Sequence, residues 1–251
     1  YHRLWRPVKG YDPLGSIWQE DHPVASLDYL RDERFACQAE MRSLLTTAKL
    51  ILDDLYELFN YIEPDDTNLS VFSHRIYELL LRTATEFETN CKGILKDNGY
   101  AKADNKMNMS KDYFKLASVM RLSEYKVVFD RWSTNHQFAP FIDWNTTSYL
   151  PLTWYQGYNN VKHNRYSIFK QASLENLMNS LAGLLCILHA QYGEKMAYGF
   201  VNNLSLGLNY QEQLEIEQFT IIAPTFPEAE QYDFIWDVLK TEPNPVQKYI
   251  F

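Results

Sequence analysis

The residues best suited to chemistry lie in one short segment, 154–165, which reads Trp-Tyr-Gln-Gly-Tyr-Asn-Asn-Val-Lys-His-Asn-Arg. On a helix Asn159 and His163 share a face, because residues four apart lie one above the other. A neutral imidazole at His163 can take a proton from a ribose 2′-hydroxyl, and Asn159 can orient that imidazole. Lys162 and Arg165 can stabilise the charge that develops on a phosphodiester. The segment is therefore suited to RNA cleavage without a metal; the alternative is a histidine that only caps or packs a helix end.

A second set of polar residues, Arg75, Glu78, Arg82 and Glu86, lies three and four residues apart on another expected helix. The order of Glu78 and Arg82 favours an ion pair along that helix. Arg82 and Glu86 could complete a cleft opposite His163. The alternative is a solvated ladder of ion pairs, each contributing about 0.3–0.5 kcal/mol.

Several kinds of chemistry find no support in the sequence. The six histidines do not approach metal-ligand spacing, and no phosphate-binding glycine loop or serine-nucleophile elbow is present, so we expect no metal and no cofactor. The three cysteines lie far apart in apolar patterns, as expected for buried free thiols in a reducing cytoplasm. No run of 18 apolar residues occurs, which argues against a membrane span.

Charge is distributed unevenly along the chain. The whole chain carries −8, whereas residues 121–170 contain six bases and three acids, so that segment is +3 and the remainder −11. Residues 151–170 contain no acid, and aromatic residues alternate there with the bases: Trp154, Tyr155, Tyr158, Tyr166 and Phe169. Bases mixed with aromatics can hold a phosphate backbone and stack nucleobases. The alternative, which this pattern favours by itself, is an aromatic stripe in the core with solvated lysines.

Apolar spacing predicts a mostly α-helical protein. Gly and Pro together make up only 19 of 251 residues, too few for the turns of a sandwich or barrel. Helical spacing predicts helices over about 30–61, 70–96, 110–120, 151–163 and 172–192, and β-branched runs predict strands at 125–129 and 218–223. Ser110 is the expected cap of the third helix, and Asn98-Gly99 the end of the second.

Three parts of the chain follow from these elements. Residues 1–29 have prolines without a period and are expected to form an irregular arm. Residues 30–192 are the helical domain. Residues 193–251 form an acidic extension packed on the bundle, of net charge −6 from residue 194 onward.

The run WYQGYNNVKHNR, followed by ASLENLMNSLAGLLCIL, resembles proteins of the HEPN superfamily, and LLLRTATEFETNCKGIL at 79–95 resembles an earlier helix of the same bundle. The signature of that family is Arg-Asn-x-x-x-His. Asn159 and His163 match it at the right spacing, whereas Tyr158 stands where the family has arginine. The resemblance covers roughly residues 30–192.

The resemblance implies a HEPN-like helical bundle with a few short peripheral strands. It implies a metal-independent RNase, or a protein derived from one, in bacterial antiphage defence or a toxin–antitoxin system. His163 would be the general base and Asn159 its orienting group. The residues expected to bind RNA phosphate are Lys162, Arg165, Arg82 and Tyr158, with Glu86 and Tyr155 in support.

The resemblance also implies a homodimer, with a partner protein or antitoxin as a further possibility. The alternative function is a catalytically inactive HEPN-like subunit that binds RNA, a nucleotide or another protein, which the tyrosine in the Arg position favours. A third interpretation is a purely structural bundle, in which the aromatic residues are core.

Overall fold

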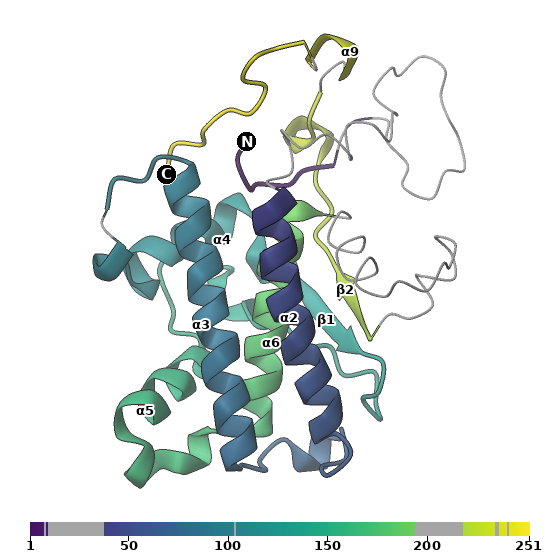
Figure 1. Ribbon diagram of the computed structural model, residues 1–251, viewed down its shortest axis with the longest axis vertical. Helices are drawn as coiled ribbons and strands as arrows, with labels where there is room; N and C mark the ends of the chain where they lie inside the picture. Colours follow the sequence, from purple (N-terminus) through teal and green to yellow (C-terminus); the bar gives the residue numbers. More distant parts are fainter. Residues whose placement is uncertain (8, 10–37, 103, 194–217, 234–235, 240) are drawn as a thin grey trace.

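The computed structural model describes residues 1–7, 9, 38–102, 104–193, 218–233, 236–239 and 241–251. These residues form a mostly helical protein, as the apolar spacing predicts (Figure 1). The elements that matter below are α2 (Gln38–Leu58), α3 (His74–Asp97), α4 (Lys115–Val119), α5 (Thr153–Ile168), α6 (Leu174–Tyr192), α9 (Trp236–Leu239), β1 (Lys126–Phe129) and β2 (Phe219–Ile222).

Helix α6 is the central element, with α3, α2 and α5 packed against it (Figure 1). Nearly every side chain of α6 is buried, as expected for a helix that is apolar on all sides. Helix α3 is amphipathic and buries one face, which includes Ile76, Leu80 and Phe87. The hydrophobic effect on these faces therefore places α5 beside α3 and α6.

The predicted long helices are confirmed, with small shifts at their ends. The 70–96 helix begins at His74, because the Ser73 side chain accepts a hydrogen bond from the backbone N–H of Ile76 at 3.1 Å. It ends as predicted: Asn98 is the C-cap and Gly99 has a φ of +85°, in the left-handed region that glycine adopts freely. Asn108, not Ser110, caps the turn that precedes α4, through Lys111 N–H at 3.0 Å.

Both predicted strands are present, and they pair with each other in antiparallel orientation, with Lys126 opposite Ile222 and Phe129 opposite Phe219. This two-stranded sheet lies against α6, where Val127 and Phe129 are buried. The pairing ties the segment that follows residue 217 to the helical bundle.

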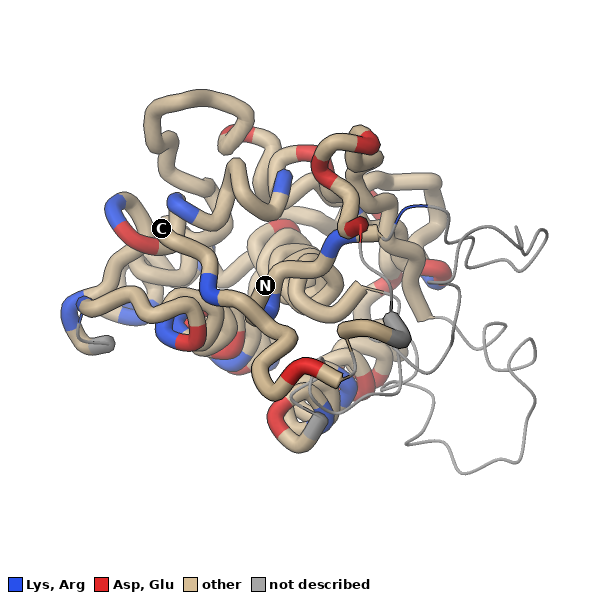
Figure 2. Tube along the Cα trace, turned by 90° about the horizontal axis from the view of Figure 1, so that it is seen from above, with Lys and Arg blue, Asp and Glu red and all other residues tan. Residues whose placement is uncertain are grey.

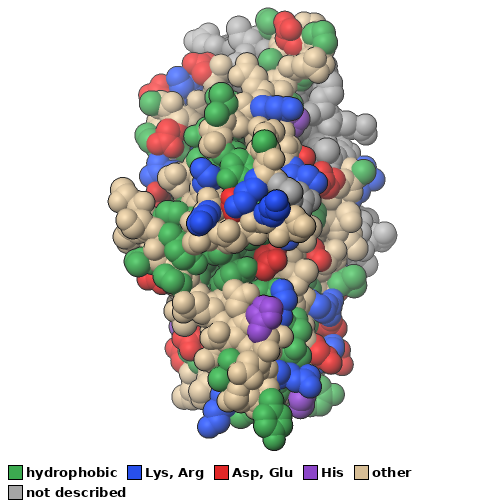
Figure 3. All heavy atoms as spheres, turned by 90° about the vertical axis from the view of Figure 1, so that its left-hand side faces the viewer, with side chains coloured by type: hydrophobic (Ala, Val, Ile, Leu, Met, Phe, Trp, Pro, Cys, Tyr) green, Lys and Arg blue, Asp and Glu red, His purple; other side chains and the backbone are tan. Residues whose placement is uncertain are grey.

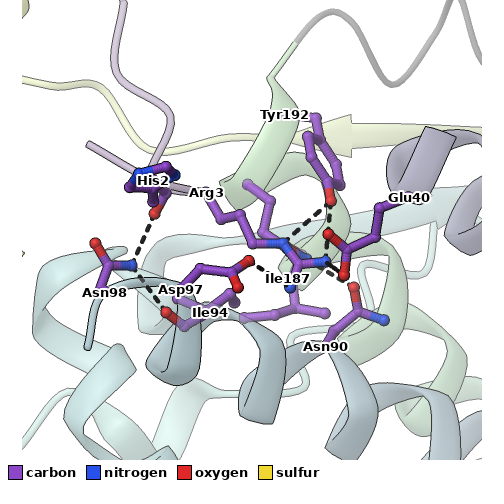
Figure 4. A network of polar contacts seen from close by, with 10 residues as sticks. His2, Arg3, Glu40, Asn90, Ile94, Asp97, Asn98, Ile187 and Tyr192 are labelled. Atoms are coloured by element: carbon purple, nitrogen blue, oxygen red, sulfur yellow. Dashed lines mark hydrogen bonds and ion pairs between the residues drawn. The ribbon is translucent and has the colours of Figure 1, made fainter. Parts of the chain in front are cut away.

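The N-terminal residues are part of the packed structure at one end of the bundle (Figure 1), where His2 and Arg3 contact the helices (Figure 4). Arg3 is buried; it donates to the Tyr192 hydroxyl at 3.2 Å and forms ion pairs with Glu40 at 2.9 Å and Asp97 at 3.3 Å. Its guanidinium lies on Gly93, where a Cβ would be only 1.9 Å from Arg3 Nη1. The glycine thus lets Arg3 approach α3. The first seven residues lack regular structure, as expected, but they pack on the helices.

The described part of the C-terminal extension also packs on the bundle. Tyr249 N–H donates to Asn98 Oδ1 at 2.8 Å, and Glu230 forms an ion pair with Arg121 at 3.3 Å. Predictions for residues 10–37 and 194–217, including the start of the first helix, lie outside the described residues. Within the described part of the chain, no helix combines the length and the hydropathy that crossing a bilayer requires.

His189, near the end of α6, makes folding stability depend on pH. Its Nδ1 lies 3.1 Å from the Tyr125 hydroxyl and its ring 5.3 Å from that of Trp5, between centroids. Burial lowers the pKa of His189 to about 4. In the unfolded chain the pKa of a histidine is near 6.5, so between about pH 4 and pH 6.5 the unfolded state binds a proton that the folded state does not bind. Stability is therefore full above about pH 6.5 and falls as the pH drops toward 4.

We expect the free energy of unfolding to fall by roughly 2–3 kcal/mol between pH 7 and pH 4 on account of His189. Urea denaturation across this range measures it. His189→Gln should flatten the slope, and His74→Gln, a change at an exposed histidine, should leave it unaltered. If the free energy of unfolding of His189→Gln falls with pH as steeply as that of the wild type, the pH dependence does not come from His189.

Candidate nucleic-acid interface on α5

Helix α5 carries the segment that the sequence singles out. It starts just after Pro151 and is regular as far as His163; Asn164, with φ −143° and ψ 53°, leaves the helical conformation. The predicted end near His163 therefore coincides with a break in the helix. Gly157 allows α5 to approach α6, because a Cβ there would lie 2.3 Å from the side-chain nitrogen of Asn176.

The aromatic residues at the start of α5 belong to the core. Trp154, Tyr155 and Tyr158 are all buried, and Trp154 Nε1 donates to the Pro140 carbonyl at 2.9 Å. For these three residues the core interpretation of the stripe is correct. Tyr166, beyond the break, is fully exposed.

This burial corrects the role expected of Tyr158. Its side chain is 1% exposed, so its ring cannot lie against an RNA strand. Its hydroxyl instead accepts a hydrogen bond from Lys162 Nζ at 2.8 Å, and the same ammonium lies 4.9 Å from the centre of its ring. The hydrogen bond to Tyr158 raises the pKa of Lys162, so this lysine is charged at neutral pH. The charge at this point of the helix comes from Lys162.

The other expected site residues of α5 lie at its surface end. His163 and Arg165 are exposed, and Asn159 is partly buried. The Arg165 guanidinium lies 5.4 Å from the centre of the Tyr77 ring of α3. Within the described residues no hydrogen bond joins Asn159 to His163, so the orientation of the imidazole by the amide is not present in this conformation. We call Asn159, Lys162, His163 and Arg165 the α5 site.

The structure does not place Arg82 in a cleft opposite His163, the position expected from the sequence. Arg82 forms an ion pair with Asp54 of α2, which also pairs with Arg75 at 2.9 Å. Glu86 is half-buried near Arg82; burial raises the pKa of Glu86, and the positive charge of Arg82 opposes that rise. Arg75 and Arg82 lie two helical turns apart on one face of α3, so both reach Asp54. The surface ladder is thus the better interpretation, although Arg75 and Glu78, at 3.3 Å, form the pair along the helix.

The carboxylate that α3 presents to α5 is Glu88, which the sequence reasoning missed. Its Oε1 accepts a hydrogen bond from the Tyr155 hydroxyl at 2.7 Å, and its Oε2 lies 3.8 Å from Lys92 Nζ. Tyr155 therefore meets an acid, but not Glu86. A signal was available: Glu88 stands four residues after Ala84 and three before Cys91, both expected to point inward. An acid on that flank of a buried face needs a partner.

An open pocket lies beside the α5 site. It has a volume of about 570 Å³ and lies between α3, α5 and the segment 105–110. We call it the Glu88 pocket. Residues that line it and matter below are Glu88, Lys92, Asn108, Tyr149, Tyr155 and Asn159. Asn159 belongs to both the pocket and the α5 site.

Basic and acidic residues are mixed along the described trace (Figure 2). Figure 3 shows the face on which α5 lies: a cluster of Lys and Arg side chains lies above the level of α5, and a histidine lies below that cluster. Described acids of the C-terminal extension pair with bases away from α5: Glu230 with Arg121, and Asp233 with Lys9 at 3.1 Å.

Two further expectations concern metals and thiols. Among the described residues no group of three or more His, Cys, Asp or Glu side chains could hold a metal ion. Cys91 and Cys186 are free and buried, and burial raises the pKa of both thiols, which therefore behave as small apolar groups. Cys37 lies outside the described residues.

Comparison with known proteins found no family model, no curated protein and no solved structure that matches this chain.

Proposed function

We propose that this protein is a HEPN-like, metal-independent RNase whose catalytic group is His163, and that it acts as a homodimer in bacterial antiphage defence or a toxin–antitoxin system. The support for the family is the match of Asn159 and His163 to the signature, together with the mostly helical fold. The support for the chemistry comes from the α5 site.

The observation that carries the proposal is the position of Lys162. The departure from the signature is the missing arginine at position 158, and Lys162 reaches back one turn to lie on the Tyr158 ring and hydroxyl. A cation held over an aromatic face is stabilised by about 0.5–1 kcal/mol at an exposed site. The charge that the family takes from arginine is thus supplied one helical turn later, beside an exposed imidazole at His163.

In the proposed reaction His163 takes the proton of a ribose 2′-hydroxyl. The 2′-oxygen then bonds to the adjacent phosphorus, and the bond from phosphorus to the 5′-oxygen breaks. That oxygen leaves with a proton from water. Lys162 and Arg165 stabilise the charge on the phosphoryl oxygens. The products are a 2′,3′-cyclic phosphate and a 5′-hydroxyl.

The test is incubation of the full chain with end-labelled RNA in the presence of EDTA, followed by identification of the new ends. We expect cleavage that EDTA does not stop. The upstream fragment should carry a 2′,3′-cyclic phosphate at its 3′ end, and the downstream fragment a 5′-hydroxyl. Cleavage that requires a divalent cation, or 5′-phosphate products, would refute the proposed mechanism.

A second candidate is an inactive HEPN-like module that binds RNA, a nucleotide or a partner protein. The specific observation in its favour is the lack of a hydrogen bond between Asn159 and His163, which leaves the imidazole without its expected orienting group within the described residues. RNA binding without cleavage would favour this candidate.

Under either candidate Lys162 contacts phosphate. We expect Lys162→Met to weaken RNA binding by about 3- to 10-fold at low salt and to reduce the slope of log affinity against log salt by about 1, because one phosphate contact is lost. Fluorescence anisotropy with a labelled RNA measures both. The control is Lys49→Met on α2, which removes the same charge from the Asp53 pair at 2.7 Å. Equal effects of the two variants would mean that only net charge matters.

For the proposed homodimer, the fully exposed ring of Tyr166 supplies an aromatic surface next to Arg165. Interfaces between protein subunits are enriched in tyrosine and arginine.

A further inference from the structure

The Glu88 pocket contains a charged group that the cleavage chemistry does not use. Glu88 is 17% exposed, and it is the one carboxylate among the described residues that line the pocket. Around it stand side-chain amides, among them Asn108 and Asn159, and the rings of tyrosines. A volume of about 570 Å³ is within the range of small-molecule sites.

The partners of Glu88 leave it able to accept more hydrogen bonds. Oε1 accepts one from Tyr155 at 2.7 Å, and Oε2 faces Lys92 at 3.8 Å. Each carboxylate oxygen has two lone pairs, so both can accept again. Burial and the negative charge of Glu88 raise the pKa of Tyr155, which keeps the phenol protonated as a donor and fixes the carboxylate.

The walls of the pocket suit a flat heterocycle. Tyr149 is partly buried and lines the pocket together with Pro151 and Met107. Unstacked RNA bases bind to aromatic side chains by stacking and to polar groups by their edges. A carboxylate in the wall of such a pocket selects ligands that present N–H donors.

We propose that the Glu88 pocket binds a guanine base, with Glu88 accepting hydrogen bonds from the N1–H and N2–H groups. Guanine presents these two donors side by side on its Watson–Crick edge. Adenine and cytosine present one amino group next to an acceptor nitrogen, and uracil presents one N–H between two carbonyls. A carboxylate that accepts from the amino group of adenine or cytosine would face the lone pair of the adjacent ring nitrogen, and one that accepts from uracil N3–H would face two carbonyl oxygens, which costs binding energy.

The pocket and the α5 site share Asn159, which gives the guanine a place in the proposed reaction. Asn159 lines the pocket, and His163 follows it by one helical turn. A guanosine with its base against Glu88 would extend its ribose and phosphate past Asn159 toward Lys162 and His163. This step rests on the proposed function: it makes the protein an RNase that prefers to cut beside guanosine.

The test measures binding of four ribonucleoside 3′-monophosphates to the full chain by isothermal titration calorimetry. We expect the guanosine nucleotide to bind at least about 10-fold more tightly than the others, because two hydrogen bonds to a charged acceptor are at stake. Glu88→Gln should weaken its binding by roughly 10- to 100-fold and leave the other three nearly unchanged. The amide keeps an oxygen for Tyr155, so the fold should persist.

The control is Glu78→Gln, the same change on the same helix but at an exposed residue that pairs with Arg75. It should bind as the wild type does. If Glu88→Gln does not fold, the selectivity of the wild type alone decides. The inference is overturned if all four nucleotides bind equally tightly, or if no nucleotide binds.

The two proposals fail separately. Guanosine-selective binding that depends on Glu88, without any RNA cleavage, would keep the pocket and refute the RNase. Cleavage with no preference for guanosine, together with unselective nucleotide binding, would keep the RNase and refute the pocket.

Discussion

His163→Ala is expected to lower the rate of RNA cleavage by about 100- to 10,000-fold, the range in which general bases contribute to catalysis. The side chain is exposed, so the free energy of unfolding should change by less than about 0.5 kcal/mol. Single-turnover cleavage of a short labelled RNA with EDTA present measures the rate, and urea denaturation measures the stability.

The matched control is His136→Ala. His136 is another surface histidine, in the loop that follows β1, and its Nδ1 lies 2.8 Å from Asp66 Oδ1. It should cleave at the wild-type rate. A His163→Ala protein that is folded and equally active would remove His163 from the mechanism, and any remaining RNA binding would then belong to the second candidate function.

Asp112→Ala is expected to cost about 3 kcal/mol of folding stability. Asp112 is 1% exposed; it accepts hydrogen bonds from Lys102 Nζ at 2.7 Å, the Asn108 backbone N–H at 2.7 Å and the Tyr100 hydroxyl at 2.8 Å. Removing one partner of a buried pair leaves the other groups unsatisfied, which is costlier than the pair's own net contribution. These hydrogen bonds hold Tyr100, Lys102 and Asn108 together, and Asn108 lines the Glu88 pocket.

At acidic pH the difference in folding stability between the wild type and Asp112→Ala should become smaller. Burial by itself raises the pKa of Asp112, but the hydrogen bonds from Lys102, Asn108 and Tyr100 outweigh burial and lower it overall. The stabilisation is therefore present above about pH 4 and is lost as the pH falls below that.

Asp53→Ala provides the comparison for Asp112→Ala, because Asp53 is half exposed and bonds Lys49 at 2.7 Å on the helix surface. It should cost no more than about 0.5 kcal/mol. Thermal or urea unfolding of both variants from pH 3 to pH 7 measures these values. A loss below 1 kcal/mol in Asp112→Ala would show that the network contributes little.

The sequence by itself determined the helices and where they stop. Helix α6 is apolar on all sides and must be buried, and Asn98-Gly99 ends α3 because glycine adopts the left-handed conformation without strain. The regular part of α5 ends at His163, as the residue pattern predicts. These outcomes depend on local periodicity and on backbone preferences of single residues, both of which a sequence shows directly.

The tertiary structure alone decided which polar side chains meet. The spacing of Arg82 and Glu86 is as helical as that of Glu88, but the packing of α3 between α2 and α5 sends Arg82 to Asp54 and Glu88 to Tyr155. For Tyr158 the residue pattern left both solvent and core open, although it favoured the core. It is buried, and Lys162 supplies the charge there. Contacts between elements depend on how each helix is rotated about its axis, which is set by the summed packing of distant residues and not by local spacing.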